Sequence, residues 1–336
     1  MLKLRLAIVL AVVLPGCAGE PARPKPPYSK FEGSSFEPSA VAYDPATDRY
    51  LVLNDQDGLL YRYKLVKGKL ELPRGERHRE IQMPDGSTPI KFESITRLED
   101  GTFLAMTAYD RWEPDFCHFV KFRFVLKGTI QAEKVSWDDA TVTRRLQAVD
   151  PTIKYWKIEG LSTTAGDRAV VLAVRSVGLS YMNKRDVVWL VRLPRREDGG
   201  YGGPDRLVRY DAQATVGREE GASSLERNPT TGNYYLLTSY EDEEHEDTIG
   251  AHSGHLFVLP AADVEGPAGP DPAERPLPPP LRALKAKCEG LAVEPSGRVL
   301  VCFDDDKPWK KVFSGYEQNE GLFVVFEPGE LEPVKK

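Results

Sequence analysis

Five glutamates recur along the chain, each near the head of an apolar segment, and carboxylates in this pattern could bind a metal ion or accept hydrogen bonds. They are Glu37, Glu93, Glu159, Glu220 and Glu289, separated by 56, 66, 61 and 69 residues. A motif that returns at near-regular spacing is typical of repeat folds. The sequence therefore predicts a repeated structural unit with one acidic residue per copy.

A second set of acidic residues ends the next apolar segment of four repeats, and the third repeat has Arg175 there instead. In an antiparallel hairpin, the start of the first strand and the end of the second lie at the same edge of the sheet. Both sets of carboxylates are therefore expected at one face of the fold. Calcium binds six to eight oxygen atoms from such groups. The predicted metal ligands are Glu37, Glu93, Glu159, Glu220, Glu289, Asp55, Asp110 and Asp304.

Basic residues accompany these carboxylates. In four repeats a cation stands two residues before the glutamate, at Lys91, Lys157, Arg218 and Lys287, and Arg111 and Arg175 follow the second segment. Side chains two residues apart on a strand share a face. One hypothesis is a calcium ion flanked by cations that bind an anionic ligand such as a phosphate ester. The alternative is a ring of ion pairs that locks neighbouring units together.

The densest run of charge is 241–247, Glu-Asp-Glu-Glu-His-Glu-Asp, followed by His252 and His255. It could hold a divalent ion, or it could be a solvated loop between two strands. The chain contains no Gly-x-Ser-x-Gly, His-Glu-x-x-His or Cys-x-x-Cys motif, and its histidines are scattered. No catalytic residue is therefore assigned from the sequence.

The elements that must position these residues are short strands. Each repeat shows a motif strand, a turn rich in Asp, Pro and Gly, a strongly apolar strand such as 169–174, and a third strand such as 187–192. Glycine and asparagine supply the positive φ that tight hairpins need. A less regular fourth segment completes the unit. This pattern predicts an all-β fold, a β-propeller of four-stranded antiparallel blades. Five blades are counted, and the long repeats leave room for a sixth.

The last repeat ends soon after its third strand. Closure of the ring is therefore expected to borrow a strand from about 29–34, close to the N-terminal end of the predicted domain.

The N-terminal segment predicts export. Residues 1–16 combine Lys3 and Arg5 with an apolar run that is too short to span a bilayer, as in a signal peptide. Cys17 follows Leu-Pro-Gly and resembles the lipidated cysteine of a bacterial lipobox, although an ordinary signal peptide is the alternative. Ala18 in that motif favours the outer membrane. Residues 17–29 read as a proline-rich tether and 30–336 as the propeller domain.

Charge and cysteine content bound the partners. The formal net charge of −6 becomes −8 without residues 1–16, and no basic stripe is present, so nucleic acid is not expected as a partner. The expected partners are the membrane, through the N-terminal lipid, and a small anionic ligand or a protein. Cys288 and Cys302 lie on consecutive predicted strands and could form a cross-strand bridge. Buried thiols are the alternative for both, and Cys117 stays unpaired in either case.

The Glu-Gly-Leu openings resemble the phytase-like and SdiA-regulated propellers of bacteria, over the stretches 93–110, 159–175 and 289–304. The resemblance implies an exported or membrane-attached propeller. Lactonase-like propellers also open blades with Glu-Gly and bind calcium through such a glutamate, but this sequence lacks a matching set of asparagine ligands.

Three functions remain open from the sequence. The first is a lipid-anchored envelope protein that binds a ligand at an acidic channel mouth, with calcium as the candidate cofactor. The second is a calcium-dependent phosphoesterase or lactonase. The third is a protein-interaction scaffold, which full pairing of the glutamates with their neighbouring cations would favour.

Overall fold

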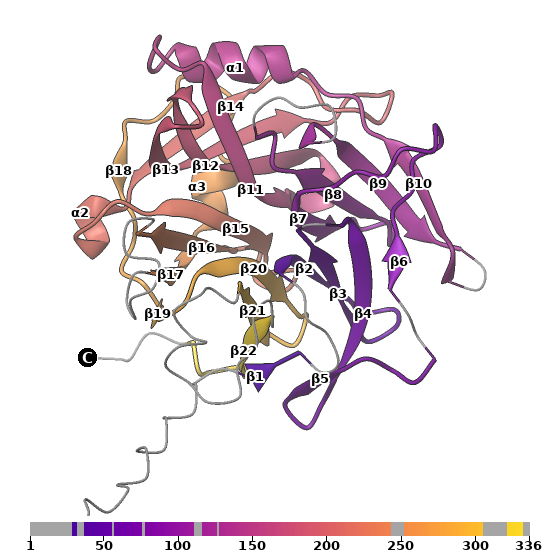
Figure 1. Cartoon of the computed structure of the whole chain (residues 1–336). Helices are drawn as coiled ribbons and strands as arrows, with labels where there is room; N and C mark the ends of the chain where they lie inside the picture. The colour runs from indigo at the N-terminus through magenta and orange to yellow at the C-terminus, as the bar shows by residue number, and fades with distance from the viewer. Residues whose placement is uncertain are drawn as a thin grey trace, which may run out of the picture.

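The computed structural model describes residues 29–31, 37–55, 57–75, 78–110, 116–125, 128–242, 252–304 and 321–331. These residues form five sheets around a central axis, a five-bladed β-propeller (Figure 1). The innermost strands β2, β7, β11, β15 and β20 each contact the next one around the ring, and β20 contacts β2. The predicted fold class and the count of five blades are confirmed.

Blades 1 to 3 follow chain order. Blade 1 contains β2 (Pro38–Asp44), β3 (Arg49–Asn54), β4 (Leu59–Val66), β5 (Lys69–Glu71) and β6 (Arg79–Glu80). Blade 2 contains β7 (Phe92–Arg97), β8 (Phe103–Thr107), β9 (Phe119–Phe124) and β10 (Ile130–Lys134). Blade 3 contains β11 (Tyr155–Thr163), β12 (Ala169–Ser180), β13 (Asn183–Pro194), β14 (Arg206–Asp211) and the parallel strand β18 (Arg275–Pro276).

Blades 4 and 5 complete the ring. Blade 4 contains β15 (Gly221–Arg227), β16 (Tyr234–Glu241), β17 (His252–Leu259) and β19 (Arg282–Leu284). Blade 5 contains β20 (Cys288–Val293), β21 (Val299–Phe303), β22 (Leu322–Phe326) and β1 (Ser29–Lys30). β1 pairs antiparallel with β22, so the predicted closure by an N-terminal strand is confirmed.

Short helices lie outside the sheets. They are α1 (Asp139–Gln147), α2 (Gln213–Val216) and α3 (Ala261–Glu265). Asp138 caps α1 by accepting a hydrogen bond from the Thr141 amide. Within the part of the chain that the structure describes, no helix is long and apolar enough to cross a membrane.

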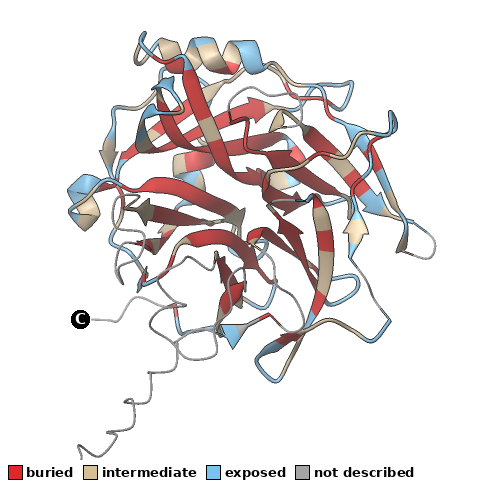
Figure 2. Cartoon of the chain, in the orientation of Figure 1, coloured by how far each residue is buried: buried red, intermediate tan, exposed pale blue. Residues whose placement is uncertain are grey.

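The hydrophobic core is divided into five clusters, one between each pair of neighbouring blades. Side chains of a strand alternate between its two faces. In β12, Leu172 and Val174 therefore join the cluster against blade 2, while Val171 and Ala173 join the cluster against blade 4. Because both faces of each blade are covered, the middle strands are continuously apolar, and Figure 2 shows that the innermost and the middle strands are both largely buried.

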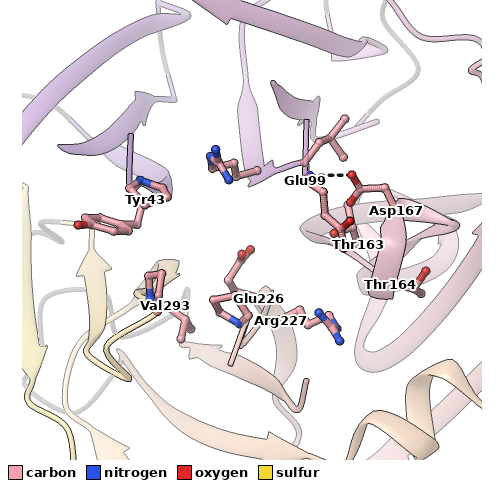
Figure 3. Close-up of a pocket in the computed structure, with 13 residues that line it drawn as sticks. Tyr43, Glu99, Thr163, Thr164, Asp167, Glu226, Arg227 and Val293 are labelled. Carbon is pink, nitrogen blue, oxygen red and sulfur yellow. Dashed lines mark hydrogen bonds between the residues drawn. The ribbon is translucent and has the colours of Figure 1, made fainter. Parts of the chain in front are cut away.

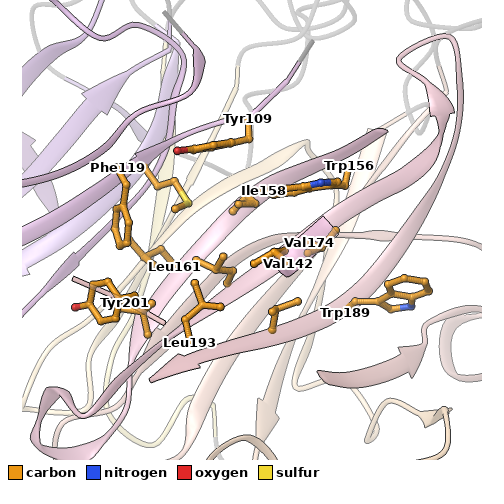
Figure 4. Packing of buried hydrophobic residues seen from close by; sticks show 14 of the residues in the cluster. Tyr109, Phe119, Val142, Trp156, Ile158, Leu161, Val174, Trp189, Leu193 and Tyr201 are labelled. Atoms are coloured by element: carbon orange, nitrogen blue, oxygen red, sulfur yellow. The ribbon is translucent and has the colours of Figure 1, made fainter. Parts of the chain in front are cut away.

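The interface between blades 2 and 3 is rich in aromatic side chains (Figure 4). The rings of Tyr109 and Trp156 stack with their centroids 5.8 Å apart. The indole N–H of Trp156 donates to the Thr143 hydroxyl at 3.1 Å, so its polar atom is satisfied inside the core.

Each inner strand carries a β-bulge near its start. The bulged residues are Ser39, Glu93, Glu159, Ser223 and Glu289. This register corrects the sequence alignment of two repeats, because Ser39 and Ser223, and not Glu37 and Glu220, occupy the position of the other glutamates. Both serine hydroxyls donate to a backbone carbonyl of the next blade, that of Phe92 or Cys288.

A small residue follows the bulge in every blade: Ala40, Ser94, Gly160, Ser224 and Gly290. A Cβ at Gly160 would lie 2.7 Å from the Cβ of Ala173 and 2.9 Å from the amide nitrogen of Leu225. The Glu-Gly motif therefore combines a bulge with a close approach between blades.

The cysteines do not form the cross-strand bridge. Cys288 lies opposite Phe303 and Cys302 lies opposite Gly290, because the bulge at Glu289 shifts the register. Cys117, Cys288 and Cys302 are free thiols.

Candidate functional site

Ion pairs fill the entry face of the propeller, which is the face where the inner strands begin. The Lys157 ammonium lies 2.6 Å from Oε1 of Glu159 and 3.2 Å from Oε1 of Glu93. Arg175, at a second bulge on β12, pairs with Glu159 through one guanidinium nitrogen and with Glu241 through the other. Glu93, Glu159 and Arg175 are each at most 6% exposed, so these charges are largely removed from water.

Lys287 organises the other half of this face. Its ammonium lies 2.9 Å from Glu289, 3.2 Å from Asp304 and 3.7 Å from Glu241. The entry-face lattice is the resulting network of Glu93, Lys157, Glu159, Arg175, Glu241, Lys287, Glu289 and Asp304. Its pairs connect blade 2 to 3, blade 3 to 4 and blade 4 to 5.

Burial and pairing shift the pKa values of the lattice in opposite directions. Burial raises the pKa of Glu93 to about 7, against the opposing effect of Lys157. Burial likewise raises the pKa of Glu289 well above its usual value. For Glu159 and Glu241, burial acts to raise the pKa, but Arg175 and the neighbouring lysines together outweigh it and hold the pKa below the usual value. The lattice therefore combines ionised carboxylates with carboxyls that retain a proton near neutral pH.

Glu37, Asp55 and Lys91 lie at the edge of the lattice and line the same small pocket. Lys91 pairs with Asp55 across the interface of blades 1 and 2, and not with a lead glutamate. Glu37 stands two residues before the bulge of its strand, which is the position that Lys91 and Lys157 hold in blades 2 and 3.

Glu220 and Arg218 are not part of this gathering. Glu220, 1% exposed, pairs with Arg218 at 2.9 Å and His255 at 3.0 Å, and accepts a hydrogen bond from Thr238. All these partners belong to blade 4. Glu220 therefore does not line the small pocket that the other four lead glutamates share, because it stands three residues before the bulge of its strand at Ser223.

The remaining predicted site residues are distributed around the face. Asp110 is buried beside the Tyr155 hydroxyl at 3.3 Å, in the cleft described below and not at the axis. Arg111 lies outside the described residues, as do 243–251 of the acidic run, the signal peptide 1–16 and Cys17.

The arrangement gives the calcium hypothesis no support. Among the described residues, no group of three or more His, Cys, Asp or Glu side chains is arranged to hold a metal ion. The axial pocket has a volume of about 60 Å³, and its glutamates face lysines. A cation site would need carboxylates without such partners, so calcium binding stays an untested prediction.

A larger cleft opens beside the lattice. This entry-face cleft has a volume of about 530 Å³, within the range of pockets for small organic ligands. One wall is the hairpin of β12 and β13, whose strands are 12 residues each. Its lining comprises Lys91, Asp110, Lys157, Arg175, Ser176, Tyr181, Met182, Lys184, Arg185, Asp186, Glu219, Tyr240, Glu241, Asp242 and Lys287.

Sequence reasoning missed the hairpin side of this cleft. The Lys184 ammonium lies 4.1 Å from the centroid of the Tyr181 ring, a cation–π contact. The Arg185 guanidinium lies 5.3 Å from the centroid of the Trp189 ring and makes a long contact of 3.9 Å with Asp150. Burial raises the pKa of Asp186 against the effect of Arg175. The available signal was the charged run 184–186, two basic residues followed by one acidic residue, immediately before the apolar strand 187–191.

No family model matches the chain, and no curated protein is similar to it in sequence. Similar solved structures include a luciferin-regenerating enzyme, 8% identical with a TM-score of 0.43, covering 89% of this chain and 93% of that one. A Carbohydrate-Active Enzymes Family AA12 protein of Trichoderma reesei is 11% identical with a TM-score of 0.43, covering 91% and 82%. A gluconolactonase of Xanthomonas campestris is 9% identical with a TM-score of 0.37, covering 85% and 71%. These likenesses concern the fold and not the function.

Proposed function

We propose that this protein is a ligand-binding β-propeller of the bacterial cell envelope, anchored through a lipid on Cys17, whose entry-face cleft binds a small anionic molecule. The observation that carries the proposal is the cleft of about 530 Å³ with Lys184 and Arg185 on its wall. Within the described residues, Lys184 forms no ion pair with a carboxylate. Arg185, whose side chain is 49% exposed, has a long contact with Asp150 and a cation–π contact with Trp189. Two cations without close counter-ions favour an anion.

The ion pairs at the axis support a binding protein over a metal enzyme. Lys157, Arg175 and Lys287 line the cleft but are already paired with the lattice carboxylates. The cations of the hairpin are therefore the ones that would bind the anion. Tyr181 and Tyr240 on the lining add flat apolar surface for the organic part of a ligand.

The test is binding of inorganic phosphate, a sugar phosphate and citrate by calorimetry. The double variant Lys184→Gln/Arg185→Gln is compared with Lys64→Gln/Lys69→Gln, which removes the same charge from exposed positions on blade 1. We expect at least tenfold weaker binding by the first variant alone. Absence of binding to all three anions, or equal loss in both variants, would reject the proposal.

A second candidate is an acid–base hydrolase of lactones or phosphate esters. It is favoured by Glu93, whose buried carboxyl has its pKa raised to about 7, the range suited to proton transfer at neutral pH. A screen of lactones and phosphate esters, with and without chelator, tests it. Turnover that Glu93→Gln abolishes supports this candidate, and no turnover by the wild-type protein removes it.

A third candidate is a protein-interaction scaffold. It is favoured by the pairs Lys157–Glu159, Arg218–Glu220 and Lys287–Glu289, in which each cation contacts the glutamate two residues later. Met182, at the tip of the β12–β13 hairpin, is 87% exposed and would suit a protein contact. A partner that binds the wild-type protein and not Met182→Ser, with no response to the anions above, would support this candidate.

A further inference from the structure

A second cavity lies at the other end of the propeller axis. This turn-face pocket, shown in Figure 3, has a volume of about 290 Å³ and is lined by the turn after the inner strand of every blade. Tyr43 belongs to blade 1, Glu99 to blade 2, Asp167 to blade 3, Glu226 to blade 4 and Val293 to blade 5. The pocket is separate from the entry-face cleft, because the two have no lining residue in common.

Glu226 is an exception in the repeat. The equivalent register positions of the other inner strands hold small residues, Ala42, Thr96, Ser162 and Ala292. These small side chains leave space near the axis, and one blade places a carboxyl there. Figure 3 shows that carboxyl pointing into the space enclosed by the lining residues.

Two carboxyl groups in this pocket have an oxygen without a partner. Among the described residues, Oε2 of Glu226 is buried and has no hydrogen-bond partner. Asp167 is 5% exposed; its Oδ2 accepts a hydrogen bond from the Glu99 amide at 2.7 Å, whereas its Oδ1 has no partner. Buried polar atoms in native proteins nearly always have a partner, so these oxygens point to a missing donor.

The cations of the pocket do not supply that donor. The Arg97 Nε lies 3.7 Å from Oδ1 of Asp44. The Arg227 Nε lies 3.0 Å from Oε1 of Glu265 on α3. Arg227 is therefore engaged by Glu265, whereas Arg97 has only this long contact with Asp44, and its Nε has no hydrogen-bond partner among the described residues. Within the same residues, neither arginine forms an ion pair with Glu226 or Asp167.

We propose that the turn-face pocket binds a small organic cation, a primary ammonium or guanidinium group on a short apolar chain. The cationic head would donate hydrogen bonds to Oε2 of Glu226 and Oδ1 of Asp167. The chain would lie against the apolar part of the wall, which includes Val293 and three prolines. A charged donor satisfies both the missing hydrogen bonds and the missing counter-ion, whereas a neutral polyol satisfies only the first.

Proton linkage follows from the same burial. Burial raises the pKa of Glu226 well above its usual value, with Thr96 and Arg227 acting against it, and burial also raises the pKa of Asp167. A cation binds the ionised carboxylates, so binding must release protons and strengthen as pH rises. The other charged groups around the pocket are the ion pairs Arg97–Asp44, Arg227–Glu265 and Arg298–Glu294, together with Glu99. Glu99 accepts a hydrogen bond from the Gly166 amide.

The experiment is calorimetric titration of the full-length protein with n-butylammonium, with n-butanol and butyrate as uncharged and anionic comparisons. We expect binding of n-butylammonium only, at least tenfold tighter at pH 8 than at pH 5.5, with proton release measured in two buffers of different ionisation enthalpy. Glu226→Gln and Asp167→Asn should each weaken binding at least tenfold. Glu133→Gln, an exposed carboxylate on β10, is the matched control and should bind as the wild-type protein does.

Several results would overturn the proposal. They are no binding of n-butylammonium, equal binding of n-butanol, binding without proton release, and equal effects of Glu226→Gln and Glu133→Gln. If a pocket variant does not fold, the wild-type protein still decides the question, because n-butylammonium must shift the methyl resonances of Val293 and Leu98. The Lys184→Gln/Arg185→Gln variant should leave this binding unchanged, so the proposal can fail or succeed independently of the entry-face cleft.

Discussion

Lys157 of blade 3 forms an ion pair with Glu93 of blade 2, with 3.2 Å between Nζ and Oε1, across the interface between the two blades. The same ammonium holds Glu159 of its own blade at 2.6 Å. One lysine therefore neutralises carboxylates from two adjacent inner strands. Removing Lys157 leaves two buried carboxyl groups without that partner. The stability lost in this way is larger than the stabilisation that the ion pairs themselves contribute.

Lys157→Met is expected to lower the free energy of unfolding by about 3 kcal/mol. Denaturant unfolding measures this change. The control is Lys121→Met on β9, which breaks the more exposed ion pair with Asp100 and should cost less than about 1 kcal/mol. Equal effects of the two substitutions would contradict a structural role of the lattice.

Stability should fall as pH rises from 4.5 to about 7. The usual pKa of a glutamate is 4.5, and burial raises that of Glu93 to about 7 in the folded state. Between these values the folded state keeps a proton that the unfolded state has lost, so stability decreases by up to about 1.4 kcal/mol per pH unit. The raised pKa of Glu289 also makes stability fall as the pH rises above 4.5.

Below pH 4.5 the sign reverses. The pKa values of Glu159 and Glu241 are lowered in the folded state, so stability is lost as the pH falls through them. Stability should therefore be greatest near pH 4.5 to 5, measured by denaturant unfolding across the pH range. Glu93→Gln should flatten the decline between pH 4.5 and 7, and an unchanged slope in that variant would reject the assignment.

Gly160→Ala should destabilise the ring by about 1 to 3 kcal/mol, because its Cβ would lie 2.7 Å from the Cβ of Ala173 and 2.9 Å from the Leu225 amide. Gly269→Ala is the matched control, since nothing lies within 4 Å of a Cβ at that position. Thermal unfolding of both variants checks the difference. A tolerated Gly160→Ala would mean that the inner strands are not closely packed there.

The thiols of Cys288 and Cys302 should react with a maleimide only after unfolding. Both are buried, and burial raises the pKa of each thiol, so the reactive thiolate is rare. Reductant should leave the unfolding midpoint unchanged. Rapid labelling of the native protein, or a midpoint lowered by reductant, would contradict the free and buried state.

Chelation should leave the melting temperature unchanged, because lysines and arginines already occupy the carboxylates at the entry face. Thermal unfolding with calcium and with chelator provides the measurement. A shift of several degrees would restore the calcium hypothesis. Repeating it with Lys157→Met asks whether the lysine excludes a metal ion from this position.

The sequence was sufficient for the blades because local signals define them. Two signals repeat along the chain: turns with Asp, Pro and Gly, and apolar strands that are covered on both faces. The closure by β1 could also be predicted, because the last repeat is short. The equivalence of Glu37 and Glu220 with the other glutamates was wrong, since the position of a bulge depends on strand register and not on residue type.

Both cavities are formed by residues far apart in the chain, and no local sequence pattern predicts such contacts. The cleft exists because the β12–β13 hairpin extends along the entry face, and the turn-face pocket needs one turn from each of five blades. Glu226 shows the difficulty. In the sequence it is an ordinary acidic residue near the end of a strand, and only the register reveals that its four equivalents are small.

Strand β1 pairs with β22, so the two ends of the described chain meet in blade 5. This pairing joins residues almost a full chain length apart, and contacts of such separation form late in folding, after a large loss of chain entropy. The outer edge of β22 stays open until then, which exposes it to pairing with other chains. When the chain is synthesised from its N-terminus, the ring therefore stays incomplete until residues 321–326 have been made. Aggregation should compete with folding at this last step.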